Sequence, residues 1–493
     1  MADIAPYARR IPMNAADTLL GGHDPQRIAL VCGTEHVTYG ELRDSAARNA
    51  AALRSRGIAR GERVAVKLPD GSAWVGAFLG TLWAGGIAVA VNPRIPADEW
   101  QSILGDAHFH LILAESRDDT PPQYRDRVVP LAEWLADVAR VAPIAPEEMD
   151  AEAPAFWTHS SGTTGKPKAV VHAHRFAREI ERVSAERLGV TADDRLFASS
   201  KLFFSYPLTN SLFAGLKLGA TVILDPQWPT AAGVVATLAT QRPTVLFSVP
   251  SLYRNLLKEG LAPSVSEHGV RMCVSAGEAL APTLRDEWRR QTGIGIVNGY
   301  GASETLVLVL VSRDETEDLR PSPGVDITAL KDAAAGAPTR LCIRTSTVAL
   351  GYWDRPAAQS ESFHDGAFCP ADLFVKTDAG GWRFAGREDS LVKIRGRWVN
   401  LAELEERLAA GAPSILEAAA VSVADSDGVD SVAFFFVPKA NAEAQIDAAL
   451  QSLVETLPHY QRPRWLHAVT TLPRTPTGKL MRRTLQELHR TLE

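Results

Sequence analysis

The sequence predicts an α/β fold, with a large N-terminal domain of mainly parallel sheets and helices and a small α+β domain after it. Two observations carry this prediction. Short apolar, β-prone runs alternate with helical segments over most of the chain, and this pattern changes after about residue 386. The chain has 493 residues, of which 46% are hydrophobic and 22% charged, as in a globular protein with a large core. We therefore expect domains at residues 1–387 and 388–493.

The first clear element is an uncharged stretch from Gly71 to Pro93. It is apolar enough for a membrane span, but Gly85 and Gly86 interrupt it, and glycine commonly ends helices. The stretch therefore predicts a buried helix over residues 73–84 followed by a buried strand, and no membrane span.

The N-terminus has no apolar segment followed by a small-residue cleavage site, so no signal peptide is expected. The four cysteines are far apart in sequence and form no C-x-x-C pair, which disfavours a disulfide framework or a cysteine-rich zinc site. Both observations predict a reducing compartment, the cytoplasm. The cysteines are Cys32, Cys273, Cys342 and Cys369.

The middle of the chain alternates strands and helices. Residues 230–240 look helical, and residues 244–249 (TVLFSV) form an apolar, β-prone run. A helix capped by Ser251, a strand over residues 270–275 and a helix opened by Pro282 are expected next. This alternation is typical of parallel sheets covered by helices.

The C-terminal region predicts a compact unit of its own. A helix over residues 401–408 precedes strands over residues 417–423 and 432–437. A helix over residues 444–456 and a last strand over residues 464–470 follow. About a hundred residues in this order are enough for a small domain.

The charge balance argues against a nucleic-acid partner. The chain carries 52 basic and 58 acidic residues, a net charge of −6. No domain-wide basic excess is available to contact a phosphate backbone.

Residues 158–168 (THSSGTTGKPK) combine two glycines, five hydroxyl side chains and two lysines. Glycines let backbone N–H groups converge on an anion, and hydroxyls and lysines add donors and positive charge. The segment lacks the G-x-x-x-x-G-K-[ST] spacing of a Walker loop. From the residues alone, a phosphate-binding loop and a solvated polar turn are equally favoured. Residues 170–183, which follow, look helical.

A family resemblance decides between these readings. The segment resembles the phosphate loop of the adenylate-forming superfamily, which includes acyl-CoA synthetases, peptide-synthetase adenylation domains and luciferases. Five further matches follow in the family's order, and with the loop they make six, which argues strongly against chance. The five are residues 275–280 (SAGEAL), residues 300–304 (YGASE), Asp372, residues 386–389 (GRED) and residues 476–479 (PTGK).

The resemblance implies that ATP activates a carboxylic acid, with Mg²⁺ offsetting the repulsion between anionic reactants. It implies that Glu304 holds Mg²⁺ and that Lys479 bridges the carboxylate and the α-phosphate, so these two residues form the catalytic set. Tyr300 would stack on adenine and Asp372 would accept both ribose hydroxyls. The implied nucleotide-binding set is Ser160, Ser161, Gly162, Thr163, Thr164, Gly165, Lys168, Gly277, Glu278, Tyr300, Gly301, Ser303, Asp372 and Arg387.

A second half-reaction with a thiol is also implied. The family rotates a mobile C-terminal domain about a hinge, which matches Asp389 here. The rotation withdraws Lys479 and brings the loop around Gly396 to the site. A glycine there lets the pantetheine arm of CoA pass close to the backbone.

Residues 201–207 (KLFFSYP) and 397–400 (RWVN) resemble the equivalent segments of benzoate-type CoA ligases. Aromatic walls suit an aromatic acid through stacking and edge contacts. The alternative is that these aromatic side chains are ordinary core residues. The implied acid-binding set is Phe204, Tyr206, Ala276, Gly301 and Val307.

The chain departs from the family at three places. Val307 stands where benzoate-type ligases often carry histidine, which argues for an altered pocket and against unsubstituted benzoate. Residues 369–371 (CPA) replace the usual Arg-Thr-Gly before Asp372, and Ala169 replaces a glycine.

The predicted function is thus an AMP-forming aryl acid–CoA ligase with ATP, Mg²⁺ and CoA. One alternative delivers the acyl group to a separate acyl carrier protein. Another is a non-catalytic nucleotide-binding protein, against which Lys479, Asp372 and Glu304 argue. The sequence leaves open whether the chain forms a homodimer.

Overall fold

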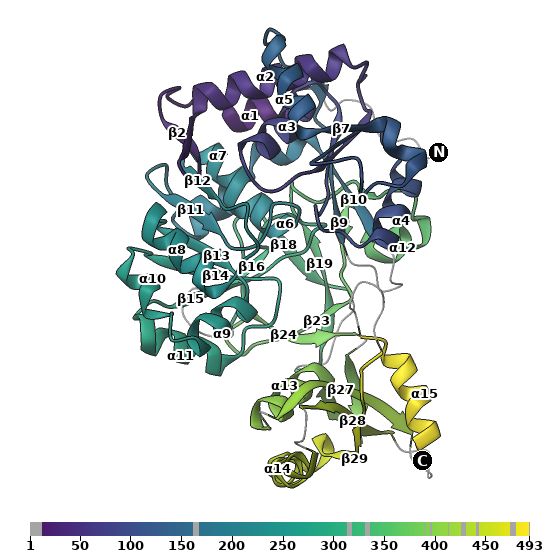
Figure 1. Cartoon of the computed structure of the whole chain (residues 1–493). Coiled ribbons are helices and arrows are strands. Elements are labelled where there is room, and N and C mark those ends of the chain that lie inside the picture. The colour runs from purple at the N-terminus through teal and green to yellow at the C-terminus, as the bar shows by residue number, and fades with distance from the viewer. Residues whose placement is uncertain are drawn as a thin grey trace.

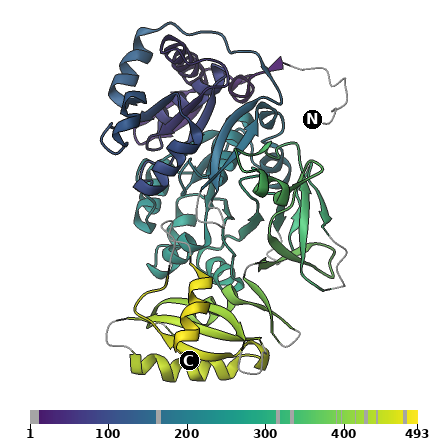
Figure 2. The ribbon, with the colours of Figure 1, turned by 90° about the vertical axis from the view of Figure 1, so that its right-hand side faces the viewer.

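The computed structural model describes residues 12–160, 167–312, 318–330, 336–388, 390–394, 397–412, 414–424, 430–439, 443–473 and 480–492. These residues form a large N-terminal α/β part and a smaller C-terminal part, one above the other in Figure 1. A view turned by 90° shows the same two parts (Figure 2). The predicted fold class is confirmed, and the boundary at residue 387 stays a prediction.

The first large sheet has seven strands, and five neighbouring strands run parallel. Its order is β20 (Gly351–Tyr352), β10 (Lys168–Ala173), β9 (Pro154–Ser160), β5 (Ile87–Ala90), β4 (Arg63–Lys67), β6 (Leu111–Ala114) and β7 (Val128–Pro130). All of β5 and β6 is buried, as expected for parallel strands covered on both faces.

The second large sheet has nine strands, of which the central six are parallel. Its order is β17 (Arg320–Pro321), β16 (Leu310–Ser312), β15 (Ile296–Tyr300), β14 (Met272–Ser275), β13 (Val245–Ser248), β11 (Arg195–Ala198), β12 (Thr221–Leu224), β2 (Ile28–Cys32) and β3 (Glu35–Thr38). The strands expected over residues 244–249 and 270–275 are confirmed as β13 and β14.

Helices cover both sheets. The expected helices over residues 73–84 and 230–240 and the one opened by Pro282 are confirmed as α3, α8 and α11. Helices α8 to α11 pack on one face of the nine-stranded sheet, and α2 and α3 join the core that both large sheets share. The bounds are α1 (Ala15–Leu20), α2 (Tyr39–Ser55), α3 (Ser72–Trp83), α4 (Ala97–Ala107), α5 (Leu131–Arg140), α6 (Ser205–Pro207), α7 (Ala214–Leu218), α8 (Ala231–Gln241), α9 (Pro250–Lys258), α10 (Pro263–Glu267), α11 (Pro282–Thr292) and α12 (Pro356–Ser362).

Smaller sheets complete the N-terminal part. Within the largest of them, Asp372 pairs in register with Arg387 on the neighbouring strand. The strands are β18 (Asp326–Ala329), β19 (Thr339–Arg344), β21 (Phe363–His364), β22 (Ala367–Phe368), β23 (Asp372–Lys376) and β24 (Trp382–Arg387), with β1 (Pro12–Met13) paired to β8 (Met149–Asp150).

The C-terminal part contains a hairpin and a three-stranded sheet with helices on both faces. Phe434 and Phe436 face one helix pair, and Phe435 faces the last helix, as the period of two along a strand requires. All the elements expected in this region are confirmed, and the last helix was not predicted. The elements are β25 (Leu391–Ile394), β26 (Arg397–Asn400), α13 (Leu401–Gly411), β27 (Ile415–Ala424), β28 (Asp430–Pro438), α14 (Glu443–Thr456), β29 (Pro463–Ala468) and α15 (Arg482–Leu492).

Two local predictions are wrong. The helix expected over residues 170–183 begins as strand β10, where the β-branched Val170 and Val171 pair with β9 and lie in the core. A 3₁₀ turn over His174–Arg178 and a π turn over Val183–Arg187 follow. Ser251 does not cap α9, because Pro250 already opens that helix.

The cysteine prediction is also wrong in part, because Cys342 and Cys369 form a disulfide. They are 27 residues apart in sequence, but β19 pairs with β22 at Ile343 and Phe368, so the two cysteines lie side by side. Cys32 and Cys273 are free thiols. The spacing of the cysteines in sequence could not predict this disulfide, because it depends on the register between β19 and β22.

None of the helices in the described part of the chain is long and apolar enough to span a bilayer. The membrane-like stretch from Gly71 to Pro93 is instead helix α3 and strand β5, both buried in the core.

Candidate active site

Two of the predicted motifs lie at the carboxyl ends of neighbouring strands of the nine-stranded sheet. Ser275 ends β14 and Tyr300 ends the neighbouring parallel strand β15. Gly277 comes two residues after Ser275 and Gly301 directly after Tyr300, so the two motifs lie at one sheet edge. This edge is where open α/β sheets bind ligands. A Cβ at Gly301 would lie only 2.7 Å from the carbonyl oxygen of Val307, which explains the glycine.

Tyr300, Asp372 and Arg387 form one cluster. The Tyr300 hydroxyl donates to Asp372 Oδ2 at 2.6 Å, and Arg387 Nη1 lies 3.6 Å from Asp372 Oδ1. Burial and the Asp372 charge raise the pKa of Tyr300 well above its usual value, so the hydroxyl stays protonated. The Tyr300 ring packs against Phe374 and Phe384. The Asp372 carboxylate is thereby held at the hydroxyl end of the Tyr300 ring.

Glu304 is 6% exposed and lies in a second polar cluster. Its Oε1 accepts the Tyr352 hydroxyl at 2.6 Å, and Lys168 Nζ lies 4.6 Å from the centre of the Tyr352 ring. Burial raises the pKa of Glu304, while the Tyr352 hydroxyl and the Lys168 charge oppose that rise. A desolvated carboxylate beside a lysine is suited to hold a cation next to an anionic ligand.

Ser303 connects the phosphate motifs to the aromatic segment. The hydroxyl groups of Ser205 and Ser303 hydrogen-bond at 2.6 Å, and Ser205 also lies 3.5 Å from Thr158 Oγ1. The Ser303 carbonyl oxygen lies 2.9 Å from His172 Nε2. Burial lowers the pKa of His172 to about 3, so the ring is neutral at pH 7 and Nε2–H is the donor.

The buried neutral histidines predict acid lability. Burial lowers the pKa of His172 to about 3 and that of His174 to about 4, below the usual 6.5. Between pH 4 and 6.5 the unfolded chain therefore binds more protons than the folded chain. Stability should fall as the pH is lowered through this window, by about 1.4 kcal/mol per pH unit for each histidine.

Chemical denaturation across pH 4 to 8 checks this prediction. His174→Gln should show a flatter dependence of the unfolding free energy on pH than the wild type. Parallel curves for the two proteins would contradict it.

A cavity of about 380 Å³ lies beside Ser303. Four of the five predicted acid-binding residues line it, namely Phe204, Tyr206, Ala276 and Gly301. Val307 is buried but is not among the lining residues, and its neighbours Leu306 and Leu308 line the cavity instead. The other lining residues are Ser200, Ser205, Pro207, Asn210, Val249, Gly277, Glu278, Ala302 and Ser303.

The aromatic residues of this wall differ in environment. Phe204 is 51% exposed, whereas Phe203 is buried beside it with ring centres 4.3 Å apart. The Tyr206 hydroxyl donates to the carbonyl oxygen of Val274 at 3.0 Å, which fixes the ring against β14. Tyr206 is therefore a rigid wall, and Phe204 stands at the mouth.

Glu278 also touches a helix end. Its carboxylate accepts the backbone N–H and the hydroxyl of Ser251, both at 3.0 Å. These groups belong to the first turn of α9, where the helix dipole favours a negative charge.

Several predicted residues lie outside the described residues. They are Ser161, Gly162, Thr163, Thr164, Gly165, Asp389, Gly396 and Lys479. Ser160 is described, and its buried hydroxyl has no hydrogen-bond partner among the described residues.

Sequence reasoning missed three polar residues of the site. Tyr352, Ser205 and His172 contact the motif residues Glu304 and Ser303. Ser205 lies within the aromatic segment at residues 201–207, so its place in that segment could have indicated a site residue. Tyr352 and His172 reach the site only through the pairing of β20 with β10.

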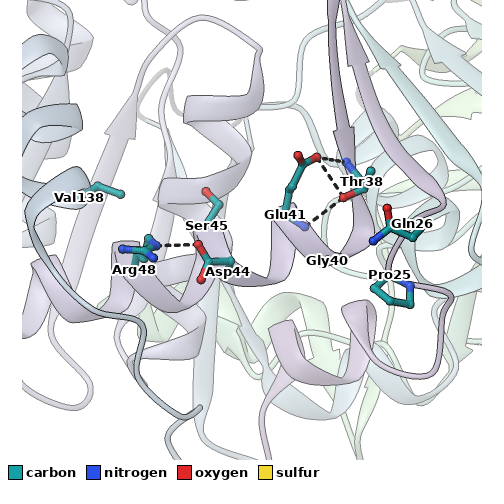
Figure 3. Close-up of a pocket in the computed structure, with 9 residues that line it drawn as sticks. All are labelled: Pro25, Gln26, Thr38, Gly40, Glu41, Asp44, Ser45, Arg48 and Val138. Atoms are coloured by element: carbon teal, nitrogen blue, oxygen red, sulfur yellow. Dashed lines mark hydrogen bonds and ion pairs between the residues drawn. The ribbon is translucent and has the colours of Figure 1, made fainter.

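A second hollow, of about 510 Å³, shares no lining residue with this site. It lies at the start of α2, and Figure 3 shows the residues that line it. Its polar contacts are internal: Thr38 and Glu41 form a capping box, and Arg48 pairs with Asp44. Such contacts stabilise the helix and give no reacting group.

Comparison with known proteins identifies the family. The family described as AMP-binding enzyme matches residues 21–353, and its C-terminal domain matches residues 403–479. The chain belongs to the AMP-binding enzyme family.

Individual relatives narrow the class. A protein of Aromatoleum sp. (strain CIB) named 3-hydroxybenzoate–CoA ligase is 36% identical over 98% of both chains. A protein of Thauera aromatica named 3-hydroxybenzoate–CoA/4-hydroxybenzoate–CoA ligase is 34% identical over 97% of both. The crystal structure of a benzoate CoA ligase from Burkholderia xenovorans LB400 matches 96% of this chain and all of its own, with a TM-score of 0.83 and 29% identity. These matches confirm the predicted class, an AMP-forming acid–thiol ligase of the aryl-CoA ligase type.

Proposed function

We propose that the chain converts a hydroxybenzoate, with 3-hydroxybenzoate as the preferred isomer, ATP and CoA into the aryl-CoA thioester, AMP and pyrophosphate. The observation that carries the proposal is the 380 Å³ cavity beside Ser303, with Phe204, Tyr206 and Ala276 in its wall. Its volume lies at the small end of the range for ligand sites, roughly 300–1,000 Å³. Two relatives with at least 34% identity carry 3-hydroxybenzoate in their names.

In the first step, a carboxylate oxygen of the acid attacks the α-phosphorus of ATP. The bond to the bridging oxygen of pyrophosphate breaks, and the acyl-adenylate forms. Asp372 accepts the ribose hydroxyls while Arg387 and Tyr300 hold its carboxylate in place. Lys479 neutralises charge as it develops between the carboxylate and the α-phosphate.

The phosphates of ATP meet hydroxyl and lysine donors. The unpartnered hydroxyl of Ser160 and the ammonium of Lys168 precede and follow the glycine-rich loop. The residues present also fit Mg²⁺, because one desolvated carboxylate, Glu304, with substrate phosphates is a usual Mg²⁺ environment. No cluster of three metal-ligating side chains occurs among the described residues, so ATP itself would supply the other ligands. When bound, the ion offsets the negative charge of the phosphates.

In the second step, the CoA thiol attacks the acyl carbon of the adenylate and AMP leaves. We assign the hinge to Asp389 and the path of the pantetheine arm to Gly396. In sequence, Gly396 lies between β25 and β26. Movement of the C-terminal part would exchange Lys479 for Gly396 at the site.

The ring of the acid lies between Phe204 and Tyr206. Ser200, Ser205 and Asn210 line the same cavity, and their hydroxyl and amide side chains are of the kind that can hydrogen-bond a ring hydroxyl. A site that hydrogen-bonds a hydroxyl disfavours the analogue that lacks it, because its own polar groups are then left unpaired.

An acid panel tests the proposal. Pyrophosphate release and thioester formation are measured for benzoate, the three hydroxybenzoates, aminobenzoates, cinnamates and medium-chain fatty acids, each with and without CoA. We expect 3-hydroxybenzoate to exceed benzoate in kcat/KM by at least about tenfold. Equal values for the two acids would refute recognition of the hydroxyl. Pyrophosphate release without a CoA thioester would point to a carrier protein as acceptor.

A further inference from the structure

A buried carboxylate outside the active site holds the segment that carries Phe204. Asp70 lies between β4 and α3 and is 7% exposed. Its Oδ1 and Oδ2 accept the backbone N–H of Leu202 at 3.2 and 3.1 Å. Asp70 belongs to the seven-stranded sheet's side of the molecule, and Leu202 follows β11 of the nine-stranded sheet. The contact therefore ties the two large sheets together directly behind the cavity wall.

The segment around Leu202 is short and tightly turned. The backbone N–H of Phe204 donates to the carbonyl oxygen of Lys201 at 2.9 Å, so Leu202 lies inside this turn. Lys201 is 6% exposed, and its ammonium donates to the carbonyl oxygen of Asp225. A displacement at Leu202 must therefore move Phe204.

The side chain of Phe204 depends on this backbone. At 51% exposure it cannot be fixed by burial alone. Its ring touches Phe203, which packs against Trp228 at 6.1 Å, and Arg94 lies over Trp228 at 4.9 Å. The segment is thus held by aromatic contacts at Phe203 and by the Asp70 carboxylate at Leu202.

We propose that Asp70 is a positioning residue for acid binding, which sets the place of Phe204 through the backbone N–H of Leu202. The proposal rests on the proposed function, in which Phe204 forms one wall of the acid site. It adds a residue that contacts neither acid nor nucleotide and yet sets the affinity for the acid. Binding of ATP, which uses the other side of the site, should not depend on it.

The ionisation of Asp70 should make the KM for the acid depend on pH. Burial raises the pKa of Asp70 to about 7, opposed by the Lys201 charge and the Leu202 N–H, while Asp225 adds to the rise. Burial also raises the pKa of the nearby Cys32 thiol, which Glu35 faces. Burial lowers the pKa of the Lys201 ammonium, which Arg94 faces. A carboxylate is a stronger acceptor than a protonated carboxyl group. The KM for the acid should therefore fall as the pH rises from 6 to 8.

The experiment compares Asp70→Ala and Asp70→Asn with the wild type, using 3-hydroxybenzoate and ATP as varied substrates. Asp70→Ala removes the acceptor and should raise the KM for the acid at least tenfold while the KM for ATP changes less than twofold. Asp70→Asn keeps an amide oxygen for Leu202 and should bring the KM for the acid back to within threefold of the wild type. It should also abolish the pH dependence of that KM between pH 6 and 8.

Asp194→Ala is the matched control. Like Asp70, Asp194 is buried. It precedes β11 of the nine-stranded sheet and pairs with Arg271 at 2.7 Å. The Asp194→Ala variant should have a lower thermal midpoint without a selective change in the KM for the acid. If Asp70→Ala raises both KM values equally or neither, or if Asp70→Asn keeps the pH dependence of the wild type, the proposal is wrong. Should Asp70→Ala not fold, the pH profile of Asp70→Asn decides alone. Failure of the proposed function would appear separately, as wild-type protein that turns over none of the acids.

Discussion

Lys479→Ala is expected to lower the rate of adenylate formation by about 10²–10³-fold. The attacking carboxylate and the α-phosphate are both anionic, and a lysine ammonium is a compact charge that can lie between them. The loss should appear in kcat more than in the KM for ATP, because the interaction strengthens as the new bond forms. Acid-dependent pyrophosphate release measures this step directly.

The second half-reaction provides the internal control for this variant. Synthetic aryl-adenylate and CoA should give thioester at nearly the wild-type rate, because the proposed domain movement withdraws the Lys479 ammonium before that step. Lys258→Ala, at an exposed lysine at the end of α9, should leave both half-reactions unchanged. Equal loss in both half-reactions would assign Lys479 to folding or to overall binding, and no loss would remove it from the catalytic set.

Local patterns predicted the parallel sheets well. The runs that became β13 and β14 are apolar and bounded by helix-opening residues, so they needed no knowledge of their neighbours. Residues 170–173 misled because a Val-Val-His-Ala run leading into an apparently amphipathic stretch is compatible with a helix. Pairing with β9, at residues 12 to 19 positions upstream, decided the outcome.

Site residues that belong to one continuous motif could be predicted from the sequence. Contacts that depend on the pairing of distant strands could not. Ser303 and Glu304 come with their motif, whereas Tyr352 reaches Glu304 only because β20 pairs with β10. The same reason explains the disulfide between Cys342 and Cys369, which depends on the register of β19 and β22. Val307 was assigned to the cavity because it stands where the benzoate-type ligases that the chain resembles often carry histidine. The backbone turns between Thr305 and Leu308, so the flanking leucines line the cavity instead.

Asp372→Ala is the second change with a large expected effect. Hydrogen bonds to a charged group contribute about 1.5–3 kcal/mol each, so loss of two ribose contacts should raise the KM for ATP by at least about 100-fold. The variant also removes the acceptor of the Tyr300 hydroxyl and the partner of Arg387. The KM for the acid should change much less, because Asp372 does not line the acid cavity.

2′-Deoxy-ATP separates ribose recognition from a general structural loss at Asp372. The wild type should use 2′-deoxy-ATP much less efficiently than ATP, because the carboxylate then accepts one ribose hydroxyl where it could accept two. In Asp372→Ala the two nucleotides should have similar kcat/KM values, since the residue that distinguishes them is gone. Tyr300→Phe keeps the ring and the carboxylate but removes the 2.6 Å hydrogen bond, and it should retain most of the discrimination. A wild type that does not distinguish the nucleotides would show that Asp372 serves the cluster with Tyr300 and Arg387 and not the ribose.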